Sequence, residues 1–186
     1  MELYTKNLLL KTVTIEDRDE VARTWAFEGG RISDSEALNA IENMQNNHNQ
    51  NQVGYIYHLC FAVLEKGYDN IIGWCGLDGQ CTPGKTVIFY MIDKDYRNRG
   101  YATQCADRLL EYAFEHAGLE CIHGGCFKDN IPSYRVMTKA GMIHNGLQDN
   151  GDPLFVINRE TYFGKSFAKE HAPMKADIIK SNLRDL

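Results

Sequence analysis

The stretch from Thr86 to Gly118 changes its hydrophobic period once, and this change constrains the fold more than any other feature of the sequence. Thr86–Ile92 is an apolar run of strand length that is rich in β-branched and aromatic residues. After a short polar loop, apolar residues recur at helical spacing: Ala102, Cys105, Ala106, Leu109, Leu110, Ala113 and Phe114. Gly118 stands where a glycine ends a helix. The chain therefore predicts a strand that leads directly into a long helix.

Further strand and helix signals surround this unit. The expected strands are Leu8–Val13, Tyr55–Leu64, Ile71–Leu77, Thr86–Ile92, Cys121–Phe127, Met142–Leu147 and Leu154–Tyr162. Two helices are expected between the first and second strands, and a helix over Ser133–Ala140, capped by Asn130, between the fifth and sixth. This order predicts an α/β (mixed α+β) protein with one mixed sheet and helices on both faces.

The two early helices carry start signals in the sequence. Thr14 with Asp17 precedes the first helix, and the Ser33–Glu36 capping box opens the second. The apolar face expected on the second helix consists of Ala37, Leu38, Ile41 and Met44. The polar run Gln45–Gln52 then predicts an exposed loop.

Length and composition set the size of the folded unit. The chain has 186 residues, of which 44% are hydrophobic and 24% charged, as in ordinary globular proteins. We expect a single domain over residues 1–165. A polar tail over residues 166–186 follows, and we expect it to form a partial helix.

Net charge, hydrophobicity and the cysteine pattern argue against several classes of ligand and location. The formal net charge of −5 argues against nucleic-acid binding, which depends on basic surface. No stretch approaches the roughly 20 apolar residues of a membrane span, and no signal-peptide core is visible, so a cytoplasmic location is expected. None of the six cysteines forms a C-x-x-C pair, which favours reduced, mostly buried thiols over a zinc site.

The loop between the central strand and the long helix has the chemistry of a phosphate site. Residues 95–102 read Asp-Tyr-Arg-Asn-Arg-Gly-Tyr-Ala. A helix start offers free N–H groups and a partial positive charge, and Gly100 lets a phosphate approach the backbone closely. Arg97 and Arg99 add positive charge. The glycines and lysine of a P-loop and of a dinucleotide fingerprint are absent. An ordinary turn with a basic face is the alternative.

Two linked motifs resemble the GNAT superfamily of acyl-CoA N-acyltransferases. Arg97, Gly100 and Ala102 match its pyrophosphate loop, Arg/Gln-x-x-Gly-x-Gly/Ala. The stretch from Tyr90 to Thr103 is similar to the RimJ/RimL-type branch. That branch's second signature is matched downstream, with Met in place of the usual Phe, by Asn130, Ser133, Val136, Lys139, Gly141 and Met142. Gln104 departs from the pattern, because the branch usually has an acidic residue there.

The resemblance implies a GNAT-like, mostly antiparallel sheet and acetyl-CoA as co-substrate, with no metal. In this family the strand before the loop splays from its neighbour and pairs with the pantetheine arm, and one of its N–H groups polarises the thioester carbonyl. The implied cofactor-binding residues are Tyr90, Met91, Ile92, Arg97, Asn98, Arg99, Gly100, Tyr101, Ala102, Asn130, Ser133 and Lys139. The alternative is that the strand residues simply pair within the sheet and that Asn130 is only a helix cap.

The catalytic groups implied by the resemblance are less complete. Many GNAT enzymes carry a tyrosine four residues before the closing glycine, and Met137 occupies that position here. Ser133 is the branch's candidate hydrogen-bond donor to the leaving thiolate, with Tyr134 in reserve. Asp78, at the end of the third strand, and Glu28 are candidates for the base that deprotonates the amine, although a turn aspartate and a solvated helix-end glutamate are the plainer interpretations. His123, on a strand beside the cofactor, is another candidate.

The acceptor pocket is expected between the first two helices and the hairpin, with Trp25, Phe27, Glu28 and Trp74 as candidate lining residues. The acceptor is an amine on a protein N-terminus, a polyamine or a small molecule. A GNAT-like module that binds acyl-CoA as a sensor is the alternative function, and a nucleotide-phosphate binder is a third. The chain is expected to be a monomer or a homodimer.

Overall fold

Eight strands form one mixed sheet in the computed structural model, which describes residues 1–26 and 30–170, with side chains up to residue 164. The spatial order is β1-β2-β3-β4-β5-β6-β8-β7. The strands are β1 (Glu2–Tyr4), β2 (Leu8–Lys11), β3 (His58–Glu65), β4 (Ile71–Asp78), β5 (Val87–Ile92), β6 (Cys121–Gly125), β7 (Ile143–Leu147) and β8 (Pro153–Asn158). All neighbours are antiparallel except β5 and β6. The expected mixed, mostly antiparallel sheet is confirmed.

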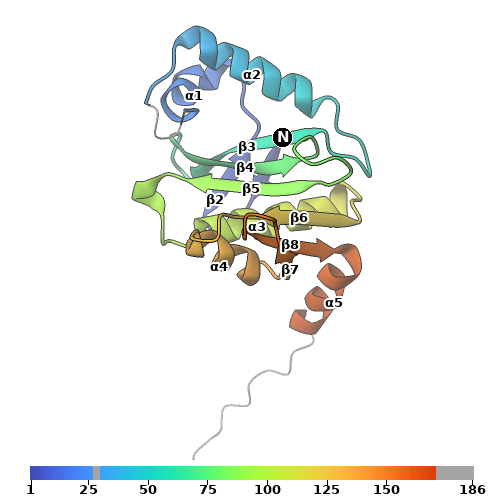
Figure 1. Cartoon of the computed structure of the whole chain (residues 1–186). Coiled ribbons are helices and arrows are strands. Elements are labelled where there is room, and N and C mark those ends of the chain that lie inside the picture. Colours follow the sequence, from blue (N-terminus) through green and yellow to red (C-terminus); the bar gives the residue numbers. More distant parts are fainter. Residues whose placement is uncertain (27–29, 171–186) are drawn as a thin grey trace, which may run out of the picture.

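Helices cover both faces of this sheet, as Figure 1 shows. One face carries α1 and α2, and the other carries α3, its continuation η4, and α4. The helices are α1 (Arg18–Thr24), α2 (Asp34–His48), α3 (Tyr101–Glu111), α4 (Ile131–Lys139) and α5 (Arg159–Glu170). Short helical turns are η1 (Ile15–Asp17), η3 (Lys94–Tyr96) and η4 (Tyr112–His116).

Two hydrophobic cores result, because successive strand residues point to opposite faces. On β3, Leu59, Phe61 and Val63 join the core beneath α3 and α4. Cys60, Ala62 and Leu64 join the core beneath α1 and α2. Both faces of the central strands are therefore buried, which explains why β3 is apolar without alternation.

The helix signals are confirmed in most details. The Ser33 backbone N–H donates to Glu36 Oε2 at 2.9 Å, and the Glu36 N–H donates to Ser33 Oγ at 3.3 Å, which closes the capping box at α2. Gly118 has a φ of 68°, as a helix-ending glycine requires. Leu38, however, is exposed, because the buried face of α2 falls on Ala37, Ala40, Ile41 and Met44. The polar run also begins inside α2, which extends to His48.

The sequence-based prediction was wrong for the first and the last strand along the chain. The short edge strand β1 was not expected, and it pairs with β2 from Glu2 opposite Lys11. The last strand ends at Asn158 rather than at Tyr162, because Asn158 Oδ1 accepts the Thr161 N–H at 2.8 Å and starts α5. This helix covers residues 166–170 of the tail, and residues 171–186 lie outside the described part.

Two further expectations from the sequence concern membrane-spanning segments and the state of the cysteines. Within residues 1–26 and 30–170, no helix is both long and apolar enough to cross a membrane. All six cysteines are free thiols, and Cys60, Cys75 and Cys105 are buried. Cys81 is exposed, so burial of the thiols is less general than the sequence suggested.

Candidate active site

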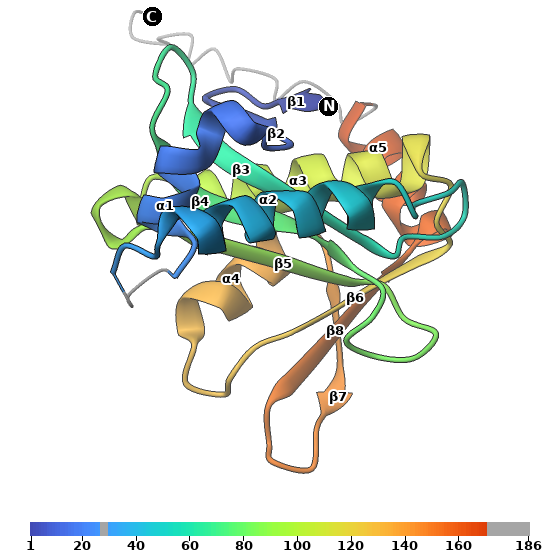
Figure 2. The ribbon, with the colours of Figure 1, turned by 90° about the horizontal axis from the view of Figure 1, so that it is seen from above.

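The parallel neighbours β5 and β6 pair at one end and separate along the rest of their length. In the described residues, Val87 opposite His123 is the single register pair between them, and the His123 N–H donates to the Thr86 carbonyl at 2.9 Å. Figure 2 shows the two strands drawing apart from this point. On its other edge β5 stays paired with β4 over its whole length. The separation leaves one edge of β5 open.

The hydrogen-bond pattern decides which backbone groups face this opening. The Asp93 N–H donates to the Ile72 carbonyl at 2.8 Å, so Asp93 and Met91 direct their backbone groups to β4. By alternation, the backbone groups of Tyr90 and Ile92 face the opening. Arg97 Nε donates to the Ile92 carbonyl at 2.9 Å from that side. Of the three strand residues expected to bind cofactor through their backbone, Met91 thus presents a side chain instead.

The loop before α3 forms a concave backbone site. Gly100 is the N-cap of α3 with a φ of 77°, a conformation that glycine adopts without strain. A Cβ built on Gly100 would meet no atom within 4 Å, so the space above the helix start is open. Asn98 also has a positive φ, of 63°. The first N–H groups of α3 lack carbonyl partners in the helix and are free to bind an anion.

A cleft of about 570 Å³, here called the loop cleft, runs from this loop to α4. It is lined by every predicted cofactor residue except Arg99. Arg99 instead donates to the Asp95 carbonyl at 3.2 Å and lies 3.6 Å from Glu65. Arg135, one turn before Lys139 on α4, also lines the cleft. It was not predicted as a site residue. The i, i+4 spacing was the available signal, because it places both cations on one face of the helix.

Ser133 is held in place from two sides. Asn130 Oδ1 accepts the Ser133 N–H at 3.1 Å, which confirms Asn130 as the cap of α4. The Tyr90 hydroxyl lies 3.0 Å from Ser133 Oγ and 3.1 Å from the Ser133 carbonyl oxygen. Burial raises the pKa of Tyr90 to about 12, so the phenol is protonated at neutral pH. The predicted role of Tyr90 involved only its backbone, and this side-chain contact was not predicted.

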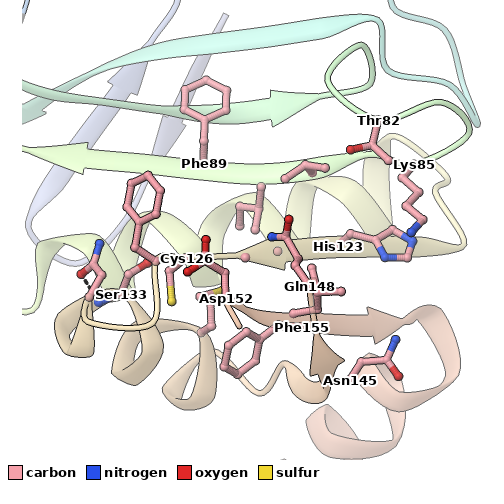
Figure 3. A pocket seen from close by; sticks show the side chains of 18 of the residues that line it. Thr82, Lys85, Phe89, His123, Cys126, Ser133, Asn145, Gln148, Asp152 and Phe155 are labelled. Atoms are coloured by element: carbon pink, nitrogen blue, oxygen red, sulfur yellow. Dashed lines mark hydrogen bonds between the residues drawn. The ribbon is translucent and has the colours of Figure 1, made fainter. Parts of the chain in front are cut away.

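A second cleft of about 610 Å³, here called the strand cleft, lies between β5, β6 and β8. Figure 3 shows the side chains that line it. Tyr90, Asn130 and Ser133 line both clefts. The Ser133 hydroxyl therefore stands where the two clefts meet.

Among the residues that the structure describes, Asp152 is the one acidic residue that lines the strand cleft, and it is only 8% exposed. Its Oδ1 accepts the Lys128 N–H and its Oδ2 accepts the Asn150 amide, each at 2.8 Å. Among the described residues, no Lys, Arg or His nitrogen lies within 4.0 Å of this carboxylate. Buried charges usually have an ionic partner, so this carboxylate can accept a cation from the cleft.

Cys126 lies between Asp152 and Ser133, and all three residues line the strand cleft (Figure 3). Burial raises the pKa of the Cys126 thiol, and the charge of Asp152 raises it further, while a hydrogen bond with Ser133 lowers it. Asp152 was not predicted as a site residue, because it lies between the last two expected strands, where an aspartate in a turn is ordinary.

Two other candidates lie outside both clefts. Asp78 Oδ1 accepts the N–H groups of Gln80 and Cys81, and its Oδ2 lies 3.5 Å from His58 Nδ1. Tyr134 is 38% exposed and packs edge-on against Phe155, with ring centroids 5.0 Å apart. The structure brings neither residue to the junction at Ser133.

A smaller hollow lies where the acceptor pocket was expected, and it is lined by only some of the predicted residues. A hollow of about 390 Å³ between Trp25, α2 and His58 includes Trp25. Trp74 is buried in the core, edge-on to Trp25 at 4.9 Å, and does not line it. Phe27 and Glu28 lie outside the described residues.

Known proteins with similar sequences are bacterial N-acetyltransferases. The uncharacterized N-acetyltransferase YnaD of Bacillus subtilis (strain 168) is 44% identical over 86 residues, 46% of this chain and 51% of that protein. The uncharacterized N-acetyltransferase p20 of Bacillus licheniformis is 24% identical over 154 residues, 78% of this chain and 84% of that protein. The chain thus spans about half the length of YnaD and most of p20.

Solved structures share the fold. RimJ of Mycobacterium smegmatis, solved in complex with CoA-disulfide, has a TM-score of 0.69 at 15% identity and covers 90% of this chain and 94% of its own. A GNAT-family acetyltransferase from Bacillus anthracis has a TM-score of 0.65 at 22% identity, over 86% and 99% of the two chains. The family model described as acetyltransferase (GNAT) domain matches residues 7–143. The chain therefore belongs to the GNAT acetyltransferase family.

Proposed function

We propose that this chain, through a domain over residues 1–165, is an acetyl-CoA-dependent N-acetyltransferase that acts on a primary amine. The observation that carries the proposal is the junction at Ser133, where a basic, loop-lined cleft meets a second cleft with a buried carboxylate. Such a junction can present a thioester from one side and an amine from the other. A protein N-terminus, a polyamine and a small amine all satisfy this requirement.

The loop cleft is the proposed site of acetyl-CoA. The pyrophosphate would bind the free N–H groups after Gly100, beside Arg97, and the pantetheine would pair with the open edge of β5 at Tyr90. Arg135 and Lys139 supply positive charge for further phosphate groups. RimJ, which shares this fold, was solved in complex with CoA-disulfide, and this supports a CoA ligand for the chain.

The proposed reaction is direct attack within a ternary complex. Asp152 takes a proton from the acceptor ammonium, and the neutral amine forms a C–N bond with the thioester carbonyl as the C–S bond breaks. The Tyr90 backbone N–H stabilises the oxyanion. As the C–S bond breaks, the attacking nitrogen loses its second proton, which passes through the Ser133 hydroxyl to the departing thiolate, so that the products are the amide and the CoA thiol. The Tyr90 phenol orients the Ser133 hydroxyl.

The direct test of this function is thiol release from acetyl-CoA in the presence of a panel of primary amines. Acceptor-dependent release above the rate of hydrolysis supports the transferase. Tight acetyl-CoA binding with no release for any amine would instead favour the sensing module. In that case the protein would bind the co-substrate without turning it over.

Replacing Ser133 by alanine is expected to lower kcat by roughly 10- to 100-fold, since a hydrogen bond to a charged group contributes about 1.5–3 kcal/mol. The Kd of CoA should change little. Thr138→Ala is a matched control, because Thr138 is a hydroxyl residue on the same helix that donates to the Tyr134 carbonyl and lines neither cleft. Wild-type turnover by the Ser133→Ala enzyme would move the donor role to water or to another group.

A further inference from the structure

The strand cleft has opposite charges at its two ends. Figure 3 shows Asp152 beside Cys126 at the end nearest Ser133, and Lys85 beside His123 at the other end. His123 precedes Cys126 by three residues along β6 and its continuation, which corresponds to about 10 Å of extended chain. The two charged ends are therefore separated by roughly the length of a short peptide.

The cationic end has no anion of its own. Lys85 is exposed, and among the described residues no carboxylate oxygen lies within 4.0 Å of its Nζ. Burial lowers the pKa of the His123 ring, and the charge of Lys85 lowers it further, which shows that Lys85 acts on this part of the cleft. His123 Nε2 lies 3.6 Å from Cys121 Sγ, and an N–H of the ring and the Lys85 ammonium can both donate to an anionic group.

Around Gly124 and Gly125 the cleft carries no charged side chain and is lined by the backbone of β6 and by apolar side chains, among them Met137 and Leu154. Gly124 and Gly125 supply backbone without side chains, and a Cβ on Gly124 would lie 2.9 Å from Met137 Sδ, so the close packing of α4 excludes a larger residue there. The side-chain amide of Gln148 lies at this stretch, with its Nε2 3.7 Å from a Cβ built on Gly125. This region suits the amide groups of a chain that spans the two charged ends.

We propose that the acceptor is dipolar, with its primary amine at Asp152 and an anionic group, a carboxylate or a phosphate, at Lys85 and His123. A peptide amino terminus with an acidic third residue has this spacing, at about 3.3 Å per extended residue. The inference rests on the proposed function, because that function identifies the amine at Asp152 as the group that is acetylated. It disfavours polyamines, whose second cation would meet Lys85.

The test compares amidated tetrapeptides that carry Asp, phosphoserine, Asn or Lys at position 3, with spermidine as the polyamine. Their Kd for the CoA-bound protein and their rates of thiol release from acetyl-CoA are both measured. We expect the two anionic peptides to bind about fivefold more tightly than the Asn peptide and the Lys peptide more weakly, as for a partly exposed ion pair. Asp against phosphoserine distinguishes the two kinds of anion.

Lys85→Glu should reverse this order, so that the Lys peptide becomes the best ligand, while the Kd of acetyl-CoA stays unchanged. Lys66→Glu, in the β3–β4 turn, makes the same change in net charge away from the cleft and should keep the wild-type order. Equal binding of all four peptides, or an unchanged order in Lys85→Glu, would overturn the proposal. Selective binding without thiol release would support the dipolar cleft and contradict the transferase.

Discussion

Gly100→Glu is expected to abolish CoA binding while the protein remains folded. Gly100 has a φ of 77° and open space above it, at the start of α3 where the pyrophosphate is proposed to lie. Glutamate would place an anion in that space. It would also hold the backbone in a left-handed conformation at a cost of about 1–2 kcal/mol, which a chain of this length can tolerate. Calorimetry with CoA measures the loss directly.

Gly67→Glu separates the two effects of this change. Gly67 has a φ of 85° in the turn between β3 and β4, and a Cβ there would also meet nothing within 4 Å. This variant should lose similar stability and bind CoA with wild-type affinity. If Gly100→Glu bound CoA with unaltered affinity, the loop before α3 would not be the pyrophosphate site. It would then be an ordinary strand-to-helix turn.

Asp152→Asn is expected to lower kcat/KM for the amine by about 10²- to 10⁴-fold at pH 7, the range for loss of a general base. An asparagine oxygen can still accept the Lys128 N–H, so the loop should remain in place. The loss should shrink as the pH rises towards the pKa of the amine, about 8 for an α-amine, because the acceptor then arrives already deprotonated. A pH series of acetylation rates measures both effects.

The neighbouring Asp149 provides the control for this variant. Asp149 is an exposed aspartate of the same turn and does not line the strand cleft. Asp149→Asn should therefore keep wild-type kinetics. Wild-type rates for Asp152→Asn at pH 7 would contradict the role of Asp152 as the base. Its role would then be structural, as the residue that connects the β7–β8 turn to the Lys128 backbone.

The order of elements was predictable because the signals for it are local. The capping box at Ser33, the change of period after Thr86 and the glycine at Gly118 each act within a few residues, and each is confirmed. The start of α5 was missed, because Thr161 and Tyr162, which are residue types that favour strands, follow soon after the cap at Asn158. The motifs in the loop, in β5 and in α4 also identified residues that line the loop cleft, and Arg99 was the exception.

The catalytic groups were harder to predict, because their environment depends on contacts between distant segments. Asp152 differs from an ordinary turn aspartate only through its burial against Lys128 and Cys126. The Tyr90 phenol reaches Ser133, which lies 43 residues later in the chain. Asp78 was chosen for its position at a strand end, where the structure shows it accepting hydrogen bonds within its own turn.

The measurement that tests the central claim most directly is a thermal-shift titration of the wild-type protein with acetyl-CoA, CoA and ATP. A ligand at 100 times its Kd adds about 2.7 kcal/mol to the free energy of unfolding, which raises the Tm by roughly 5–10 °C at this chain length. We predict such a rise with acetyl-CoA and with CoA and none with ATP. A rise with ATP alone would favour a nucleotide-phosphate binder, and no response of the folded protein to either CoA species would contradict the proposed function.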